Sequence, residues 1–185
     1  MSPTLTPTTY VAFLRGINVG GHKKIPMTML RDAFLRLGFT SVKTLLASGN
    51  VIFDYEKQDT KTLSRTIETA LEKAFGFPVD VIVRSRAQLK KIERSEPFMD
   101  IPVTDQTRLY ITFLGGKLKP TTPGPYISPD GSFQIIKATN TEIFSILDLA
   151  KAQTPEAMNI LEKQFGKKIT TRNWNTIVKI IDSLD

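Results

Sequence analysis

Apolar residues in the first half of the chain switch between strand spacing and helix spacing. Residues 10–15 (YVAFLR) form a short apolar run with β-branched and aromatic side chains, which is typical of a buried strand. A glycine-rich stretch follows, and the next apolar residues have the i, i+3, i+4, i+7 spacing of one helix face. These residues are Leu30, Ala33, Phe34 and Leu37. Thr28 is the expected N-cap of this helix, and Gly38 is its expected end.

Two strands, a helix and a further strand complete this pattern. Residues 42–47 and 51–55 predict strands, and the tripeptide SGN at 48–50 predicts a tight hairpin between them. The next helix ends at Gly76 and precedes a strand at 79–83. Its apolar face consists of Leu63, Ile67, Ala70, Leu71 and Ala74. The order βαββαβ predicts a ferredoxin-like unit.

The second half of the chain repeats the first. Matching residues occur in the same spacing at Tyr10, Phe13, Leu14 and Gly16 and at Tyr110, Phe113, Leu114 and Gly116. The segment LEKAFG at 71–76 matches LEKQFG at 161–166, and ASGNVIF at 47–53 weakly matches ATNTEIF at 138–144. Three matches in one order predict a tandem duplication.

The two copies are expected to differ in one connection. Residues 117–131 hold four prolines and lack helical spacing, so we expect that the second copy has lost its first crossover helix. An extra helix is predicted after each copy, at 85–94 and 175–184. The expected fold is therefore α+β, with two ferredoxin-like units at 1–98 and 99–185 and antiparallel sheets.

Charge is distributed unevenly between the two halves. The 185 residues include 25 Lys and Arg against 18 Asp and Glu. Residues 1–92 hold 14 basic and 7 acidic side chains, whereas residues 93–185 hold 11 of each. A basic excess favours anionic partners, so RNA, a nucleotide or a phosphorylated small molecule is the expected kind of partner.

Composition excludes several kinds of site. The chain has no cysteine and a single histidine, His22, which excludes cysteine nucleophiles, CxxC redox motifs, thiolate zinc sites and two-histidine metal sites. We therefore expect no metal and no cofactor. No apolar run reaches the roughly 18 residues of a membrane span, and residues 1–9 lack the pattern of a signal peptide. A cytoplasmic location without a membrane partner is expected, and the sequence leaves the oligomeric state open.

The loop at residues 15–24 (RGINVGGHKK) is a candidate anion site. Glycines let backbone amides turn toward a ligand, and basic side chains lie just before a helix N-terminus, where anions are favoured. The loop matches neither GxxxxGK[ST] nor GxGxxG. Arg15 corresponds to Gly115, and the rest of the loop has no counterpart in the second copy. The alternative is a long turn whose glycines supply positive φ and whose lysines are solvated.

Strand order predicts that two loops converge. In a βαββαβ sheet of order 4-1-3-2, the end of the first strand lies beside the start of the third. Residues 15–24 and 48–50 should therefore form one edge of the first sheet, which we call the loop edge. The alternative for Gly49 and Asn50 is that they serve only the turn.

The segment TTRNWNT at 170–176 is a third candidate. Arg172 and Asn173 could bind a phosphate, and Trp174 could stack on a base or sugar. Alternatively, an asparagine caps the last helix and the tryptophan packs against the core. His22 lacks an evident orienting carboxylate, and no carboxylate pair stands out. The candidate binding residues are Arg15, Gly16, Asn18, Gly20, Gly21, Lys23, Lys24, Ser48, Asn50, Arg172, Asn173 and Trp174.

The motifs RGINVGG, SGNV and TTRNWNT resemble those of the bacterial family called domain of unknown function 1697, and the resemblance covers nearly the whole chain. It implies a fold of two ferredoxin-like units and brings no particular activity. The family's shared motif positions correspond to Arg15, Gly16, Asn18, Gly20, Gly21, Ser48, Gly49, Asn50, Arg172, Asn173 and Trp174.

The leading hypothesis is a binding module for a phosphate-bearing ligand, RNA or a nucleotide, at the loop edge. Base stacking on the sheet is disfavoured, because residues 48–55 lack the first aromatic of an RNA-binding strand and place Asp54 toward phosphate. The alternatives are an enzyme or sensor for a small phosphorylated metabolite and a scaffold protein whose motifs are structural.

Overall fold

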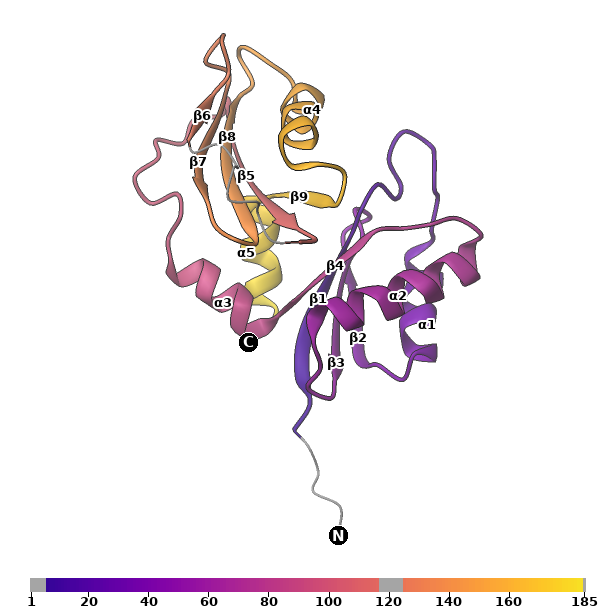
Figure 1. Ribbon diagram of the computed structural model, residues 1–185. Coiled ribbons are helices and arrows are strands. Elements are labelled where there is room, and N and C mark those ends of the chain that lie inside the picture. The colour runs from indigo at the N-terminus through magenta and orange to yellow at the C-terminus, as the bar shows by residue number, and fades with distance from the viewer. Residues whose placement is uncertain (1–5, 117–124, 185) are drawn as a thin grey trace. The chain divides into compact units, whose positions relative to one another are not determined.

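The computed structural model describes residues 6–116 and 125–184. Within these residues the protein is a mixed α/β structure with five helices and two antiparallel sheets (Figure 1). The chain divides into two compact units. Unit 1 contains the residues up to Lys90 together with Leu184, and unit 2 contains Lys91–Ser183.

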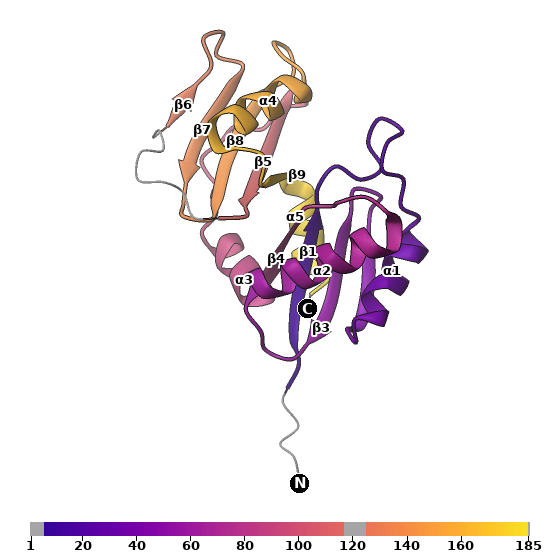
Figure 2. The same cartoon turned by 45° about the vertical axis from the view of Figure 1, so that its right-hand side comes forward.

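Unit 1 is a four-stranded sheet with two helices on one of its faces (Figures 1 and 2). Its elements are β1 (Thr8–Leu14), α1 (Met27–Arg36), β2 (Thr40–Leu45), β3 (Asn50–Tyr55), α2 (Thr60–Phe75) and β4 (Val81–Ser85), and α3 (Arg86–Arg94) follows β4 directly. The strand order is β2-β3-β1-β4 with antiparallel pairing throughout. Read from the other edge, this is the 4-1-3-2 order expected from the sequence.

The core of unit 1 follows the predicted periodicities. Alternate residues of β1, namely Tyr10, Ala12 and Leu14, pack in the cluster that contains the apolar faces of α1 and α2. The helices contribute Leu30, Ala33 and Phe34 from α1 and Leu63, Ile67 and Leu71 from α2. The intervening β1 residues, such as Val11 and Phe13, are fully buried as well. Both faces of β1 are therefore closed to solvent.

The predicted N-cap of α1 is wrong, whereas the predicted end of α2 is confirmed. Pro26, not Thr28, is the N-cap of α1, and no side chain makes a capping hydrogen bond there. Proline suits this position because its fixed φ leads into the helix and it has no N–H to satisfy. Asp59 caps α2 by accepting hydrogen bonds from Lys61 N and Thr62 N. Gly76 ends α2 at a φ of 77°, as predicted.

Unit 2 has a five-stranded antiparallel sheet of order β6-β7-β8-β5-β9. Its elements are β5 (Thr107–Leu114), β6 (Tyr126–Ile127), β7 (Phe133–Ala138), β8 (Glu142–Asp148), α4 (Thr154–Phe165), β9 (Ile169–Asn173) and α5 (Trp174–Asp182). Ala157 and Leu161 of α4 pack against the sheet residues Tyr110, Leu114 and Ile143.

The connection after β5 is only partly described. Residues 117–124 of the predicted helix-free segment lie outside the described residues. The described part of the segment contains β6, a two-residue edge strand that the sequence analysis did not predict. No helix in the described part of the chain is both long enough and apolar enough to cross a membrane.

Candidate functional site

Asn18 organises the connection between β1 and α1. Its Oδ1 accepts a hydrogen bond from Ile25 N at 2.8 Å, and its Nδ2 donates to Ile25 O at 3.1 Å. The same Nδ2 also donates to Ala47 O at 3.0 Å, in the turn between β2 and β3. Asn18 has a φ of 56°, a region that asparagine tolerates better than most residues. One side chain therefore closes the base of the loop and ties it to the neighbouring turn.

The tip of this loop is a tight hairpin turn. Val19 and His22 form an antiparallel bridge, and His22 N donates to Val19 O at 3.1 Å. Gly20 and Gly21 lie between them with φ of 59° and 80°. Positive φ at both central residues is the requirement of a type I′ turn, for which glycine is favoured. Turn geometry thus accounts for these two glycines, as the alternative interpretation proposed.

The two lysines of the loop have different surroundings. Lys23 Nζ donates to Pro78 O at 2.7 Å and lies 5.8 Å from the centre of the Phe77 ring. Lys24 is exposed and lines an open pocket of about 380 Å³. The other lining residues are Asn18, Gly21, Ile25 and Pro26. This volume is at the lower end of the range of small-molecule sites. Among these lining residues, Lys24 is the one with a charged side chain.

The second loop packs closely against the first, as predicted. Gly49 has a φ of 81°, and a Cβ on it would lie 2.8 Å from Ile17 Cδ1 and 2.9 Å from Leu14 Cβ. Gly49 O accepts a hydrogen bond from Leu14 N at 2.8 Å. Asn50 is fully buried, and its Nδ2 donates to Leu45 O at 2.9 Å and to Ser48 Oγ at 3.1 Å. Gly49 and Asn50 thus build the turn, whereas Ser48 is exposed.

Arg15 and Gly16 lie where the chain leaves β1. The Arg15 backbone N–H donates to Asp80 O at 2.9 Å, just before β4. Its side chain is half-buried, and Gly16 is exposed with a φ of 64°. The loop edge thus combines Arg15, Lys24 and Ser48 from two converging segments of unit 1.

The TTRNWNT residues belong to the framework of unit 2. Arg172 in β9 is 8% exposed, and its guanidinium donates to Thr170 Oγ1 at 2.8 Å and to Thr171 O at 2.9 Å. Burial lowers the pKa of Arg172 to about 10, so the guanidinium remains charged at neutral pH. Asn173 caps α5 by accepting from Asn175 N at 2.9 Å. Trp174 packs edge-on against Phe98, with ring centres 5.3 Å apart. These contacts match the structural alternative for the segment.

Sequence reasoning missed a counterpart of Arg172 in unit 1. Arg84 in β4 is buried and donates to Val83 O at 3.1 Å. It pairs with Val11 of β1, as Arg172 pairs with Ile111 of β5. The signal was present in the sequence, because each arginine precedes a polar residue, Ser85 or Asn173, at the end of a strand that leads directly into a helix.

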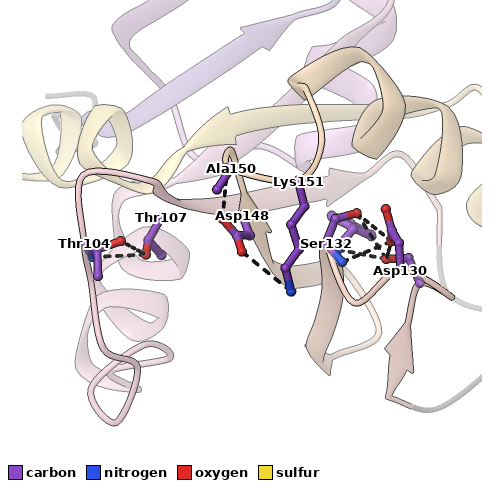
Figure 3. A network of polar contacts seen from close by, with 9 residues as sticks. Thr104, Thr107, Asp130, Ser132, Asp148, Ala150 and Lys151 are labelled. Atoms are coloured by element: carbon purple, nitrogen blue, oxygen red, sulfur yellow. Dashed lines mark hydrogen bonds and ion pairs between the residues drawn. The ribbon is translucent and has the colours of Figure 1, made fainter.

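A polar network in unit 2 stands apart from these motifs (Figure 3). Asp130 Oδ1 accepts from Ser128 Oγ at 2.6 Å, from Ser132 Oγ at 2.8 Å and from Ser132 N at 3.1 Å. These hydrogen bonds, with that from Ser128 the strongest contributor, lower the pKa of Asp130 to about 2. Lys151 Nζ lies 3.9 Å from Asp148 Oδ2. Among the described residues, no group of three or more metal-ligating side chains occurs. The hydrogen bonds that Asp130 accepts from Ser128 and Ser132 stabilise the turn between β6 and β7.

Comparison with known proteins adds a fold and a family. A search of curated proteins gives no match. The structure is similar to that of the conserved bacterial protein SP0830 from Streptococcus pneumoniae, with 21% identity, a TM-score of 0.73, and coverage of 97% of this chain and 100% of that chain. An unknown protein from Galdieria sulphuraria aligns with 13% identity and a TM-score of 0.27, over 91% of this chain and 99% of that chain.

The family match extends over the first two motifs. RGINVGG and SGNV lie inside the matched segment, whereas TTRNWNT lies beyond its end. Because residues 8–144 match the family described as protein of unknown function (DUF1697), the chain belongs to that family.

Proposed function

We propose that the chain is a binding module for a phosphate-bearing ligand at the loop edge of unit 1. The observation that carries this proposal is the open pocket lined by Lys24, on a loop that the Asn18 side chain holds in place. A preorganised loop loses little conformational entropy when a ligand binds. The ammonium of Lys24 supplies the charge that attracts a phosphate.

The start of α1 supports the same ligand chemistry. Pro26 lines the pocket and is also the N-cap of α1. The first turn of α1 contains no acidic residue, and no side chain caps it. The first backbone N–H groups of a helix have no acceptor within the helix, and the helix dipole favours an anion nearby. Ile25 and Pro26 add an apolar wall suited to the uncharged part of a ligand.

A nucleotide fits these features better than RNA does. RNA-binding sheets stack bases on aromatic side chains of the exposed sheet face. In unit 1, Tyr10–Leu14 of β1 and Asn50–Phe53 of β3 are buried, so the two central strands offer no such surface. The pocket volume of about 380 Å³ suits a small phosphorylated molecule.

The test is a thermal-shift screen with nucleoside mono-, di- and triphosphates, followed by calorimetric titration of the best nucleotide. Binding to the native state raises the melting temperature. Lys24→Gln should weaken binding by about tenfold, the effect of one lost charge-assisted contact. Lys57→Gln is the matched control, because this exposed lysine follows β3 at the opposite end of the sheet.

The salt dependence of binding distinguishes a nucleotide ligand from RNA. A nucleotide held through one phosphate group should lose little affinity as salt rises, whereas RNA binding should weaken steeply. The absence of nucleotide binding in the parent protein, or an equal loss in the Lys24 and Lys57 variants, would contradict the proposal.

We also propose that the two units are copies of one ferredoxin-like βαββαβ unit, with the boundary between residues 98 and 99. The strand orders β2-β3-β1-β4 and β7-β8-β5-β9 correspond when the edge strand β6 is set aside. Leu14 N donates to Gly49 O at 2.8 Å, and Leu114 N donates to Thr141 O at 2.9 Å. An experimental structure in which the two units superpose strand for strand is the expected outcome.

A further inference from the structure

Two large aliphatic side chains project into solvent beside the loop edge. Val19 is 66% exposed and Leu46 is 58% exposed. Asn18 Nδ2 donates a hydrogen bond to Ala47 O. Val19 directly follows Asn18, and Leu46 directly precedes Ala47, so each side chain is next to one partner of this hydrogen bond. We call Val19 and Leu46 together the apolar tip. The sequence separates them by more than twenty residues, and the hydrogen bond from Asn18 to Ala47 holds their two loops together.

The backbone at Leu46 is held in an unfavourable conformation. Its φ is 60°, a region that leucine rarely adopts. Neighbouring contacts maintain this geometry, since Asn50 Nδ2 donates to Leu45 O and Asn18 Nδ2 donates to Ala47 O. A strained residue persists only where its surroundings fix it, and such residues cluster at functional sites. Here the strained residue presents an apolar side chain to water.

Basic residues share the loop of the apolar tip. Lys23 and Lys24 follow the Gly20–Gly21 turn, and both are exposed. Arg15 begins the same loop, and its N–H binds the carbonyl of the exposed Asp80, which adds a single negative charge. Aliphatic side chains on a basic loop suit the boundary between water and an anionic bilayer, where acyl chains lie under phosphate groups.

We infer that this edge of unit 1 docks on an anionic lipid surface, with Val19 and Leu46 entering the headgroup layer and the flanking cations meeting lipid phosphates. Two aliphatic residues on loop tips lack the aromatic anchors typical of protein interfaces. The surface area that two such side chains offer is also far smaller than the roughly 800 Å² that a stable protein interface buries on each partner. Docking on a lipid surface requires neither aromatic anchors nor a buried area of that size.

This inference goes beyond the proposed function and does not depend on it. The two proposals share Lys24 as a cation, but phosphate binding in the pocket does not need the apolar tip, and the variant that tests lipid docking changes only Val19 and Leu46. It also departs from the expectation of no membrane partner. That expectation rested on the lack of a spanning segment, and peripheral docking needs none.

The experiment is co-sedimentation of the full chain with vesicles of phosphatidylserine and phosphatidylcholine, compared with vesicles of phosphatidylcholine alone. The tested variant combines Val19→Ser with Leu46→Asn, because asparagine tolerates a positive φ and should preserve the fold. Val103→Ser is the matched control, since Val103 is 62% exposed in unit 2. Circular dichroism and thermal melting of each variant check that it folds.

The parent protein should sediment with the phosphatidylserine vesicles, and raised salt should reduce this binding. The double variant should bind these vesicles at least about tenfold more weakly, because the aliphatic contribution is lost. Val103→Ser should bind as the parent does. Absence of parent binding, or equal binding by the double variant, overturns the inference. A parent dimer that the double variant abolishes, without vesicle binding, also overturns it and identifies a second copy as the occupant.

Discussion

Units 1 and 2 share a hydrogen-bonded framework and differ in the side chains at one end of it. Arg15 N donates to Asp80 O at 2.9 Å, and Gly115 N donates to Lys168 O at 2.8 Å, so the first strand leaves each sheet in the same way. Gly76 and Gly166 end the helices α2 and α4 at φ of 77° and 82°. What the two units share is therefore required for folding, and what differs is open to function.

Buried polar groups at one equivalent position illustrate the difference. Asn50 pairs with Phe13 in unit 1, and Glu142 pairs with Phe113 in unit 2. The Asn50 amide donates to neighbouring acceptors, whereas the Glu142 carboxylate accepts from the hydroxyls of Thr139 and Thr141 at 2.9 and 2.8 Å. In both units the buried polar side chain at this position has hydrogen-bond partners.

The largest expected effect tests the close packing in unit 1. Gly49→Ala places a Cβ against Leu14 and Ile17 at a φ of 81°, so we expect a loss of about 3 kcal/mol in the free energy of unfolding. In unit 2, Thr141 O accepts a similar hydrogen bond from Leu114 N, so a side chain is accommodated there. Gly116→Ala is the control, because an added Cβ meets nothing within 4 Å among the described residues beyond its chain neighbours. Urea unfolding measures both variants, and equal stability would contradict the packing argument.

The next effect concerns binding more than stability. Gly115 makes the same backbone hydrogen bond as Arg15 without a side chain. We therefore expect Arg15→Ala to lower the free energy of unfolding by less than about 1 kcal/mol. It should weaken nucleotide binding by about tenfold or more in calorimetry. Arg15→Lys should recover part of that loss, since an ammonium cannot reproduce the guanidinium geometry.

The control for Arg15 is Arg65→Ala, which removes an exposed arginine of α2. This variant should bind the nucleotide as the parent does. If Arg15→Ala melts far below the parent, or binds the nucleotide unchanged, Arg15 is not a ligand contact.

A smaller effect tests a feature common to both units. Tyr10 Oη donates to Gln58 O at 3.0 Å and accepts from Gln58 N at 2.8 Å, whereas Tyr110 Oη shares one hydrogen bond with the described residues, to Thr154 Oγ1 at 2.9 Å. Tyr10→Phe should cost about 1.5 kcal/mol of unfolding free energy, and Tyr110→Phe should cost about 1 kcal/mol. Denaturant unfolding measures both. A larger cost in unit 2 would refute this ranking.

The smallest effect belongs to the turn that only unit 2 has. The pKa of Asp130 falls from 3.8 to about 2 on folding, so the folded state favours the ionised carboxylate. The resulting stabilisation is present above a pH of about 4 and is lost as the pH falls toward 2. Asp130→Asn should remove this part of the pH dependence of unfolding. An NMR titration that finds the ordinary pKa at Asp130 would refute the assignment.

The sequence by itself determined the local elements. The spacing of Leu30, Ala33 and Phe34 identified the buried face of α1, because helix periodicity and burial are linked directly. The tyrosines and the LEKAFG and LEKQFG segments predicted that the second half repeats the first. The order of the elements also predicted that two loops meet at one edge of the first sheet.

Only the tertiary structure decided what the motif residues do. Asn18 and Asn50 stood out as polar residues near glycines, which suits either a ligand or a turn. Their partners Ile25, Ala47 and Leu45 show that both side chains build the loop edge. Hydrogen-bond partners distant in sequence are set by the path of the chain, which periodicity does not specify.

The tertiary structure also decided which side chains are exposed to solvent. Nothing in the sequence distinguishes Val19 and Leu46 from the valines and leucines of the core, or Arg172 from an exposed arginine. The fold leaves the first two in solvent and buries the third. A side chain's exposure depends on what packs over it, and those neighbours come from segments that only folding brings together.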